Sequence, residues 1–202
     1  MSSKRVLTYI IGSNGAGKST LARNILGADI THAEIKGLGY CAKSLNNAQS
    51  RTRPEIVALG RYTSACGGVD TIKPLSNAYR LGERVADLFP DSNMFMEGVI
   101  MSGLFSTPLK FLLNMKYQHG FDVEICFLYA SARESLNRVF GRNGGTAIKQ
   151  GGVLDKLKET MQNYKKFLEL GEFRCIAIDT TKINSDQVFA EFRHWSGLYE
   201  RE

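Results

Sequence analysis

The segment 12–19 reads GSNGAGKS and constrains the fold of this chain more than any other feature. It fits the pattern G-x-x-x-x-G-K-[ST], follows the apolar run Val6–Ile11 and precedes a helix-compatible stretch over 19–26. Glycines in such a loop let successive backbone N–H groups face one concavity at a helix N-terminus, which binds phosphate. Lys18 can then reach the β- and γ-phosphates, and the Ser19 hydroxyl can ligate Mg²⁺. The segment therefore predicts a strand–loop–helix unit that binds a nucleoside triphosphate, with ATP and Mg²⁺ expected.

The expected nucleotide contacts are the loop and the start of the helix after it. These residues are Gly12, Ser13, Asn14, Gly15, Ala16, Gly17, Lys18, Ser19 and Thr20.

Length and composition predict one domain over residues 1–202. The 43% hydrophobic and 23% charged residues are ordinary for a soluble chain of this size. No apolar run approaches the roughly 20 residues that span a bilayer, and the first residues do not resemble a signal peptide. We expect a cytoplasmic protein. The four cysteines form no C-x-x-C pair; Cys126 and Cys175 are expected to be buried thiols, and Cys66 is expected to fit a tight turn.

Apolar runs and helix-type patterns alternate along the chain, which predicts an α/β fold with a parallel sheet of about five strands flanked by helices. The segment 31–53 is polar and gives no firm assignment beyond a possible short strand at 37–42. The expected strands are 6–11, 55–60, 94–101, 123–129 and 174–179, and the expected helices are 19–26, 74–90, 107–118, 132–139, 153–170 and 185–198.

Basic residues gather in two segments of the chain. Residues 36–84 hold eight basic and three acidic side chains, a net charge of +5. A second group comprises Arg133, Arg138, Arg142 and Lys149, opposed by Glu134. Each group is either a solvated face or a surface for a polyanion such as nucleic acid or nucleotide.

Two carboxylates are expected near the phosphates, because ligands bind at the carboxyl ends of parallel strands. Glu97 lies in the carboxyl half of its strand, where an acid can act on Mg²⁺; the alternative is a surface carboxylate. Asp70 lies in a glycine-rich loop, where it can deprotonate an acceptor hydroxyl; the alternative is an Asp that forms the turn.

Arg138 and Arg142 lie four residues apart and therefore share a helix face. Next to the glycine-rich segment 141–145, they are candidates to stabilise the charge on a transferring phosphoryl group. The alternative is a pair of solvated arginines. Tyr62, expected to be exposed in a basic loop, is a candidate for stacking on a base, with aromatic packing as its alternative.

Taken together, these segments resemble the P-loop kinases that include nucleoside monophosphate kinases. The resemblance covers nearly the whole chain: the phosphate loop, an acceptor-binding region at about 31–90, a lid-like region at about 133–152 and the turn Ile178–Thr181. It implies that Asp179, Thr180 and Thr181 border the adenine of ATP. The chain departs from nucleoside monophosphate kinases at Glu97-Gly98, where they carry an Asp-Arg pair.

A narrower resemblance rests on the segments 59–62 (LGRY), 66–73 (CGGVDTIK) and 96–98 (MEG). These are similar to bacteriophage 5-hydroxymethyluracil DNA kinases. The resemblance implies transfer of the ATP γ-phosphate to the hydroxymethyl group of a modified pyrimidine in DNA, during hypermodification of viral thymidine. The DNA would be the partner, Lys18, Asp70, Arg138 and Arg142 would be catalytic, and Ser19 and Glu97 would serve the metal.

Two other functions remain open from the sequence. One is a kinase of free nucleosides or nucleoside monophosphates. The other is a P-loop ATPase or nucleotide-binding module with no kinase acceptor.

Overall fold

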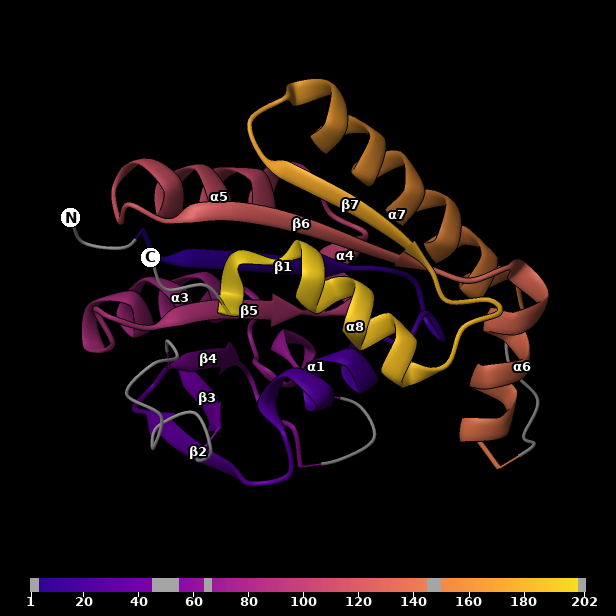
Figure 1. The fold of residues 1–202 in the computed structure, drawn as a ribbon, viewed down its shortest axis with the longest axis horizontal. Helices are drawn as coiled ribbons and strands as arrows, with labels where there is room; N and C mark the ends of the chain where they lie inside the picture. The colour runs from indigo at the N-terminus through magenta and orange to yellow at the C-terminus, as the bar shows by residue number, and fades with distance from the viewer. Residues whose placement is uncertain (1–3, 45–54, 64–66, 145–149, 200–202) are drawn as a thin grey trace.

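The computed structural model describes residues 4–44, 55–63, 67–144 and 150–199, which form a seven-stranded sheet with helices on both faces (Figure 1). The strands are β1 (Val6–Ile11), β2 (Ile30–Ile35), β3 (Gly39–Ser44), β4 (Ile56–Leu59), β5 (Asn93–Glu97), β6 (Asp122–Tyr129) and β7 (Arg174–Asp179). The helices are α1 (Lys18–Leu26), α3 (Ser76–Leu88), α4 (Val99–Ser102), α5 (Ser106–Tyr117), α6 (Ala132–Arg142), α7 (Gln150–Leu170) and α8 (Ser185–Trp195), with 3₁₀ turns η1 (Val69–Thr71) and η2 (Gly197–Tyr199).

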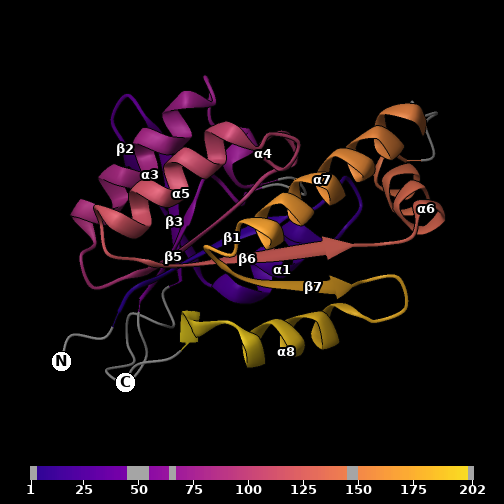
Figure 2. The same ribbon diagram turned by 90° about the horizontal axis from the view of Figure 1, so that it is seen from above.

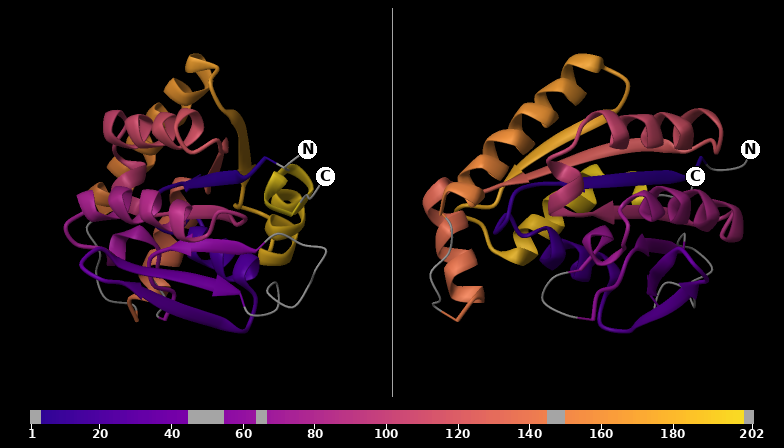
Figure 3. Two further views of the ribbon diagram at one scale, coloured as in Figure 1. Left: turned by 90° about the vertical axis from the view of Figure 1, so that its left-hand side faces the viewer. Right: turned by 180° about the vertical axis from the view of Figure 1, so that it is seen from behind.

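The strands are arranged in the order β2-β3-β4-β5-β1-β6-β7. β4, β5, β1, β6 and β7 are parallel, which confirms the five parallel strands expected from the sequence. β2 and β3 add two antiparallel strands at the edge opposite β7 (Figure 3). The sequence did not predict β2 because an exposed edge strand needs no continuous apolar run: Thr31 and Glu34 are exposed, and its other residues are half-buried.

Alternate residues of the central strand enter two separate cores, as a sheet covered on both faces requires. Leu7, Tyr9 and Ile11 pack in the core beneath α3, α5 and α7, whereas Val6 and Ile10 pack in the core beneath α1 and α8. Figure 2 shows α3, α5 and α7 on one side of the sheet and α8 on the other, with α6 beyond the arrowheads of β6 and β7. Among the described residues, no helix has the length and apolar character needed to cross a bilayer.

One expected strand was too long. The apolar run 94–101 leaves the sheet after Glu97 and, from Val99, forms the short helix α4. The cause lies outside the run: the Asp70 carboxylate accepts hydrogen bonds from the N–H groups of Val99 and Ile100, at 2.6 and 3.1 Å. A carboxylate there satisfies backbone donors that have no partner in the first turn of a helix.

The segment that connects β4 to η1 folds back on itself at a pair of glycines. A Cβ on Gly60 would lie 2.0 Å from the carbonyl oxygen of Gly68, and Gly60 has a φ of +101°. Gly68 N–H donates to the Arg61 carbonyl at 3.0 Å, which closes the crossing. Only glycine fits this crossing, which places the segment 67–70 against the end of β5.

We predict that Gly60→Ala destabilises the protein by several kcal/mol, because the added methyl collides with backbone and the positive φ is strained. Gly37→Ala is the matched control. Gly37 has a φ of +76° but nothing within 4 Å of its added Cβ, so only the conformational cost of about 1–2 kcal/mol is expected. Urea unfolding measures both, and equal losses would contradict the steric account of the crossing.

Candidate active site

The main segments of the site follow the carboxyl ends of three neighbouring strands, β1, β5 and β6. β1 leads into the phosphate loop, and it pairs with β5 so that Ile10 lies beside Glu97, and with β6 so that Ile11 lies beside Phe127. The carboxyl ends of these parallel strands therefore converge on one cleft. The cleft has a volume of about 720 Å³. It is lined by Ser13, Asn14, Gly15, Ala16, Gly17, Lys18, Ser19, Thr20, Arg23, Gly67, Asp70, Glu97, Val99, Ile100, Arg138, Arg142 and Lys156.

The phosphate loop adopts the concave form that the sequence predicted. Gly15 and Gly17 have φ angles of +78° and +91°, values that other residues rarely adopt. The Lys18 side chain folds back, and its Nζ donates to the carbonyl oxygens of Gly12 and Ser13 at 2.8 and 2.9 Å. Lys18 is only 5% exposed, so its ammonium lies at the floor of the cleft.

Glu97 is buried at the end of β5 with its carboxylate beside the phosphate loop. Its Oε1 accepts a hydrogen bond from the Ser19 hydroxyl at 3.0 Å. Burial raises the pKa of Glu97 to about 7, although Lys18, the Ser19 hydrogen bond and Arg23 act in the opposite direction. Both candidate metal residues thus lie together. Carboxylate and hydroxyl oxygens suit Mg²⁺, which keeps several waters and needs few protein ligands beside substrate phosphates.

Asp70 also lines the cleft, but both of its carboxylate oxygens already accept hydrogen bonds from the start of α4. The loop around it is closely packed. A Cβ on Gly98 would lie 2.8 Å from Asp70 Oδ1, and one on Gly68 would lie 2.7 Å from Glu97 Oε1. The geometry therefore gives Asp70 a role in holding α4, in addition to its place beside the cleft.

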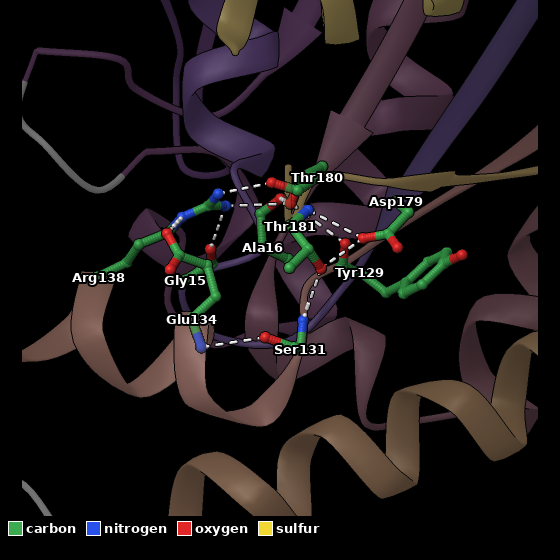
Figure 4. Close-up of polar contacts among 9 residues, drawn as sticks. All are labelled: Gly15, Ala16, Tyr129, Ser131, Glu134, Arg138, Asp179, Thr180 and Thr181. Carbon is green, nitrogen blue, oxygen red and sulfur yellow. Dashed lines mark hydrogen bonds and ion pairs between the residues drawn. The ribbon is translucent and has the colours of Figure 1, made fainter. Parts of the chain in front are cut away.

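Arg138 connects α6 to the phosphate loop and to the turn after β7 (Figure 4). Its Nη1 donates to the Gly15 carbonyl at 3.2 Å and to Thr180 Oγ1 at 3.0 Å. Its Nη2 donates to the Thr180 carbonyl at 2.6 Å, and its Nε pairs with Glu134 at 2.8 Å. Arg142, one turn later, is exposed at the cleft. In the part of the chain that the structure describes, no side-chain hydrogen bond or ion pair involves Arg142.

A second cavity of about 240 Å³ lies on the other side of Arg138. Thr180 lines it, and Leu21, Ile183 and Val188 supply apolar surface. The resemblance implies that Thr180 borders the adenine, and this role stays a prediction. The full lining of the cavity is Gly17, Thr20, Leu21, Arg138, Thr180, Ile183, Asn184, Ser185 and Val188. Asp179 takes no part in this lining: its Oδ1 accepts hydrogen bonds from Thr181 N–H and Oγ1 at 2.8 and 2.5 Å, and these lower its pKa.

The structure differs from the sequence-based expectation at Tyr62 and agrees in part at the cysteines. Tyr62 is not exposed: it is 5% accessible and packs against Phe95, with ring centroids 6.1 Å apart. Its loop folds inward because its backbone N–H donates to His32 Nε2 at 3.1 Å. Cys41 and Cys126 are buried and Cys175 is half-buried. Cys66, Lys149, Arg51 and Arg53 lie outside the described residues.

Two cations of the cleft were not identified from the sequence. Arg23 lies on α1, one helical turn after Ser19, and this spacing was a usable signal. Lys156 lies on α7, where it pairs with Glu159 at 2.6 Å, and no local motif marks it. With Lys18, Arg138 and Arg142, the described residues that line the cleft include five cations and two carboxylates, Asp70 and Glu97. This balance suits a ligand with several negative charges.

One solved structure supports the fold. The chain is similar to the PezAT chromosomal toxin–antitoxin system of Streptococcus pneumoniae, with a TM-score of 0.53 and 16% identity over 98% of this chain and 82% of that one. It also matches a deoxyadenosine kinase from M. mycoides with bound dCTP, with a TM-score of 0.44 and 15% identity over 94% and 97% of the two chains. No curated protein sequence matches the chain.

The family comparison covers most of the chain. The sequence profile described as 5-hmdU DNA kinase matches residues 2–188, which include the phosphate loop, Asp70, Glu97, Arg138 and the turn at Thr180. The protein is therefore a phosphotransferase with a P-loop kinase fold, and it belongs to the family of 5-hmdU DNA kinases.

Proposed function

We propose that this protein transfers the γ-phosphate of ATP to the hydroxymethyl group of 5-hydroxymethyluracil in DNA, a step in the hypermodification of thymidine in phage DNA. The observation that carries the proposal is a single cleft lined by the phosphate loop and by the segment 67–70, the proposed acceptor loop, in a chain whose family profile matches residues 2–188. A phage setting would place the protein in the host cytoplasm.

The donor half would bind ATP between the two cavities. The loop amides and Lys18 would hold the β- and γ-phosphates. The smaller cavity suits a flat base, because Leu21, Ile183 and Val188 give it apolar surface and the Arg138 guanidinium lies at the boundary between the cavities. Arg138 would thus fix the distance between base and phosphates.

Ser19 and Glu97 would hold Mg²⁺ and its waters, and the ion would neutralise charge that develops on the β- and γ-phosphate oxygens. Their hydroxyl and carboxylate are already 3.0 Å apart. Glu97 must lose its proton for this role, and its raised pKa of about 7 makes that ionisation relevant near neutral pH.

In the transfer, the hydroxymethyl oxygen attacks the γ-phosphorus and the bond from that phosphorus to the β–γ bridging oxygen breaks. The acceptor's proton passes to a carboxylate of the cleft or to water, and ADP leaves. Asp70 is the sequence-based candidate for the proton acceptor. Because its oxygens are engaged by Val99 and Ile100, we propose that its larger contribution is to hold α4 in place. Arg142 would stabilise the charge of the transferring group.

The acceptor side has charge suited to a DNA strand. Lys36, Lys73, Arg80 and Arg84 are exposed. Arg61 is exposed too, and its guanidinium stacks over Tyr40 at 3.5 Å. Lys43 contributes less, because it pairs with Glu55 at 2.5 Å. Exposed cations on the segment 36–84 favour a polyanionic acceptor over a free nucleoside.

The direct test supplies γ-labelled ATP and Mg²⁺ with three acceptors: DNA that contains 5-hydroxymethyluracil, the same DNA with thymine, and free 5-hydroxymethyldeoxyuridine. We expect label in the modified DNA and none in the thymine DNA. Label confined to the free nucleoside or to mononucleotides would favour the nucleoside kinase alternative. ATP hydrolysis with no labelled acceptor would favour an ATPase.

Alanine variants of Arg138 and Arg142 are predicted to lose activity in different ways. Arg138→Ala removes hydrogen bonds to Gly15 and Thr180, so the KM for ATP should rise about 10-fold or more and the Tm should fall. Arg142→Ala should leave both values nearly unchanged and lower kcat by about 10²-fold, because a cation that acts only in the transition state is lost. Steady-state kinetics and thermal melts of both variants check this, and identical profiles would contradict the division of roles.

The raised pKa of Glu97 predicts that pH affects both the reaction rate and the stability of the protein. The rate should rise with pH as Glu97 ionises, with a midpoint at or below about 7 because Mg²⁺ favours the charged form. The Glu97→Gln variant should lose most activity, and its remaining rate should no longer rise with pH. Since the folded-state pKa lies above the unfolded value, Glu97 favours folding at low pH, and that stability is lost as pH rises towards 7.

In metal-free buffer, Glu97→Gln should therefore gain stability relative to the wild type between pH 5 and pH 8, by at most about 3 kcal/mol. Thermal or urea unfolding of both proteins at the two pH values gives this difference. A wild type and variant with parallel pH dependences would contradict a buried, proton-binding Glu97.

A further inference from the structure

One apolar side chain stands out at the charged cleft. Ile100 lines the cleft, yet it is 53% exposed. Most of the lining is polar, charged or glycine, and the neighbouring apolar residues are Ala16, which is buried, and Val99, which is half-buried. Ile100 is thus a branched, exposed apolar side chain in a cleft that Arg23, Arg142 and Lys156 also line.

The backbone beneath Ile100 is fixed from several directions. Asp70 accepts hydrogen bonds from the N–H groups of Val99 and Ile100. Behind them, Ser102 is 1% exposed; its carbonyl accepts from Asn163 Nδ2 at 3.0 Å, and its Oγ accepts from Gly12 N–H at 3.2 Å. The start of α4 is therefore tied to the acceptor loop, to α7 and to the phosphate loop. These hydrogen bonds restrain the backbone of α4 and therefore the position of Ile100.

A duplex acceptor sets a geometric problem. The hydroxymethyl group on C5 of a paired pyrimidine projects into the major groove while its base stays stacked. The expected phosphate site, however, lies at the floor of a cleft where Lys18 is 5% exposed. To bring that hydroxyl to the γ-phosphate, the base must leave the stack, at a cost of a few kcal/mol. Proteins that open base steps commonly insert an apolar side chain such as Ile.

We propose that Ile100 occupies the position in the DNA stack that the modified base vacates, which favours the extruded base in the cleft. This inference rests on the proposed DNA kinase function. The cations that line the same cleft complement it, because Arg23, Arg142 and Lys156 can contact phosphates of the opened DNA. Asp70 contributes by bracing the residue that enters the DNA.

The test compares the wild type with Ile100→Ala on duplex DNA, single-stranded DNA and free nucleoside, each containing the 5-hydroxymethyl group. We expect the kcat/KM of Ile100→Ala on the duplex to fall about 10-fold or more, with little change on the other two acceptors. Ile100→Leu should keep most of the duplex activity. Leu104→Ala is the matched control: Leu104 is 41% exposed, close in sequence and not part of the cleft lining.

A direct readout of base extrusion is the fluorescence of 2-aminopurine placed next to the modified base in the duplex. The wild type and Leu104→Ala should raise it on binding, and Ile100→Ala should raise it less. Equal losses on duplex and single strands, no loss on the duplex, or a wild type active on single strands alone would each overturn the role of Ile100. A wild type active on none of the three acceptors, or on the nucleoside alone, would instead contradict the proposed function.

Discussion

The position of β1 between β5 and β6 is the constraint on which the site depends. Because these strands are parallel, the phosphate loop and Glu97 lie side by side at the carboxyl ends of β1 and β5. Helix α6 begins just beyond the carboxyl end of β6. That adjacency sets Ser19 against Glu97 and brings Arg138 to Gly15 and Thr180. Few of these side chains are neighbours in sequence, so the sheet order assembles the site.

The cost of this arrangement is a buried carboxylate. Glu97 is 1% exposed and its pKa rises to about 7, which is unfavourable for a fold that needs only stability. Its neighbours Lys18, Ser19 and Arg23 offset only part of that penalty. A group kept in this state at the end of a strand is typical of an active site. The surrounding glycines allow it, since Gly68 has no room for a Cβ beside Glu97.

Local sequence signals were sufficient for the donor half. The phosphate loop and the five parallel strands follow from glycine spacing and apolar runs. The place of Thr180 beside the adenine is implied by the family resemblance and stays a prediction. Features that depend on contacts distant in sequence were not predicted. The run 94–101 breaks after Glu97 because Asp70 caps α4, Tyr62 turns inward onto Phe95, and Lys156 reaches the cleft from α7. A half-exposed edge strand such as β2 leaves too weak a pattern to detect.

The central claim is that the ATP γ-phosphate and the acceptor hydroxymethyl group meet in the cleft between Lys18 and the segment 67–100. A crystal structure with a non-hydrolysable ATP analogue, Mg²⁺ and a 5-hydroxymethyluracil oligonucleotide measures this directly. We predict the hydroxymethyl oxygen about 3–3.5 Å from the γ-phosphorus, the metal beside Ser19 and Glu97, and the adenine near Thr180. An acceptor base in the cavity between α1 and α8, or a γ-phosphate turned away from Glu97, would contradict the account.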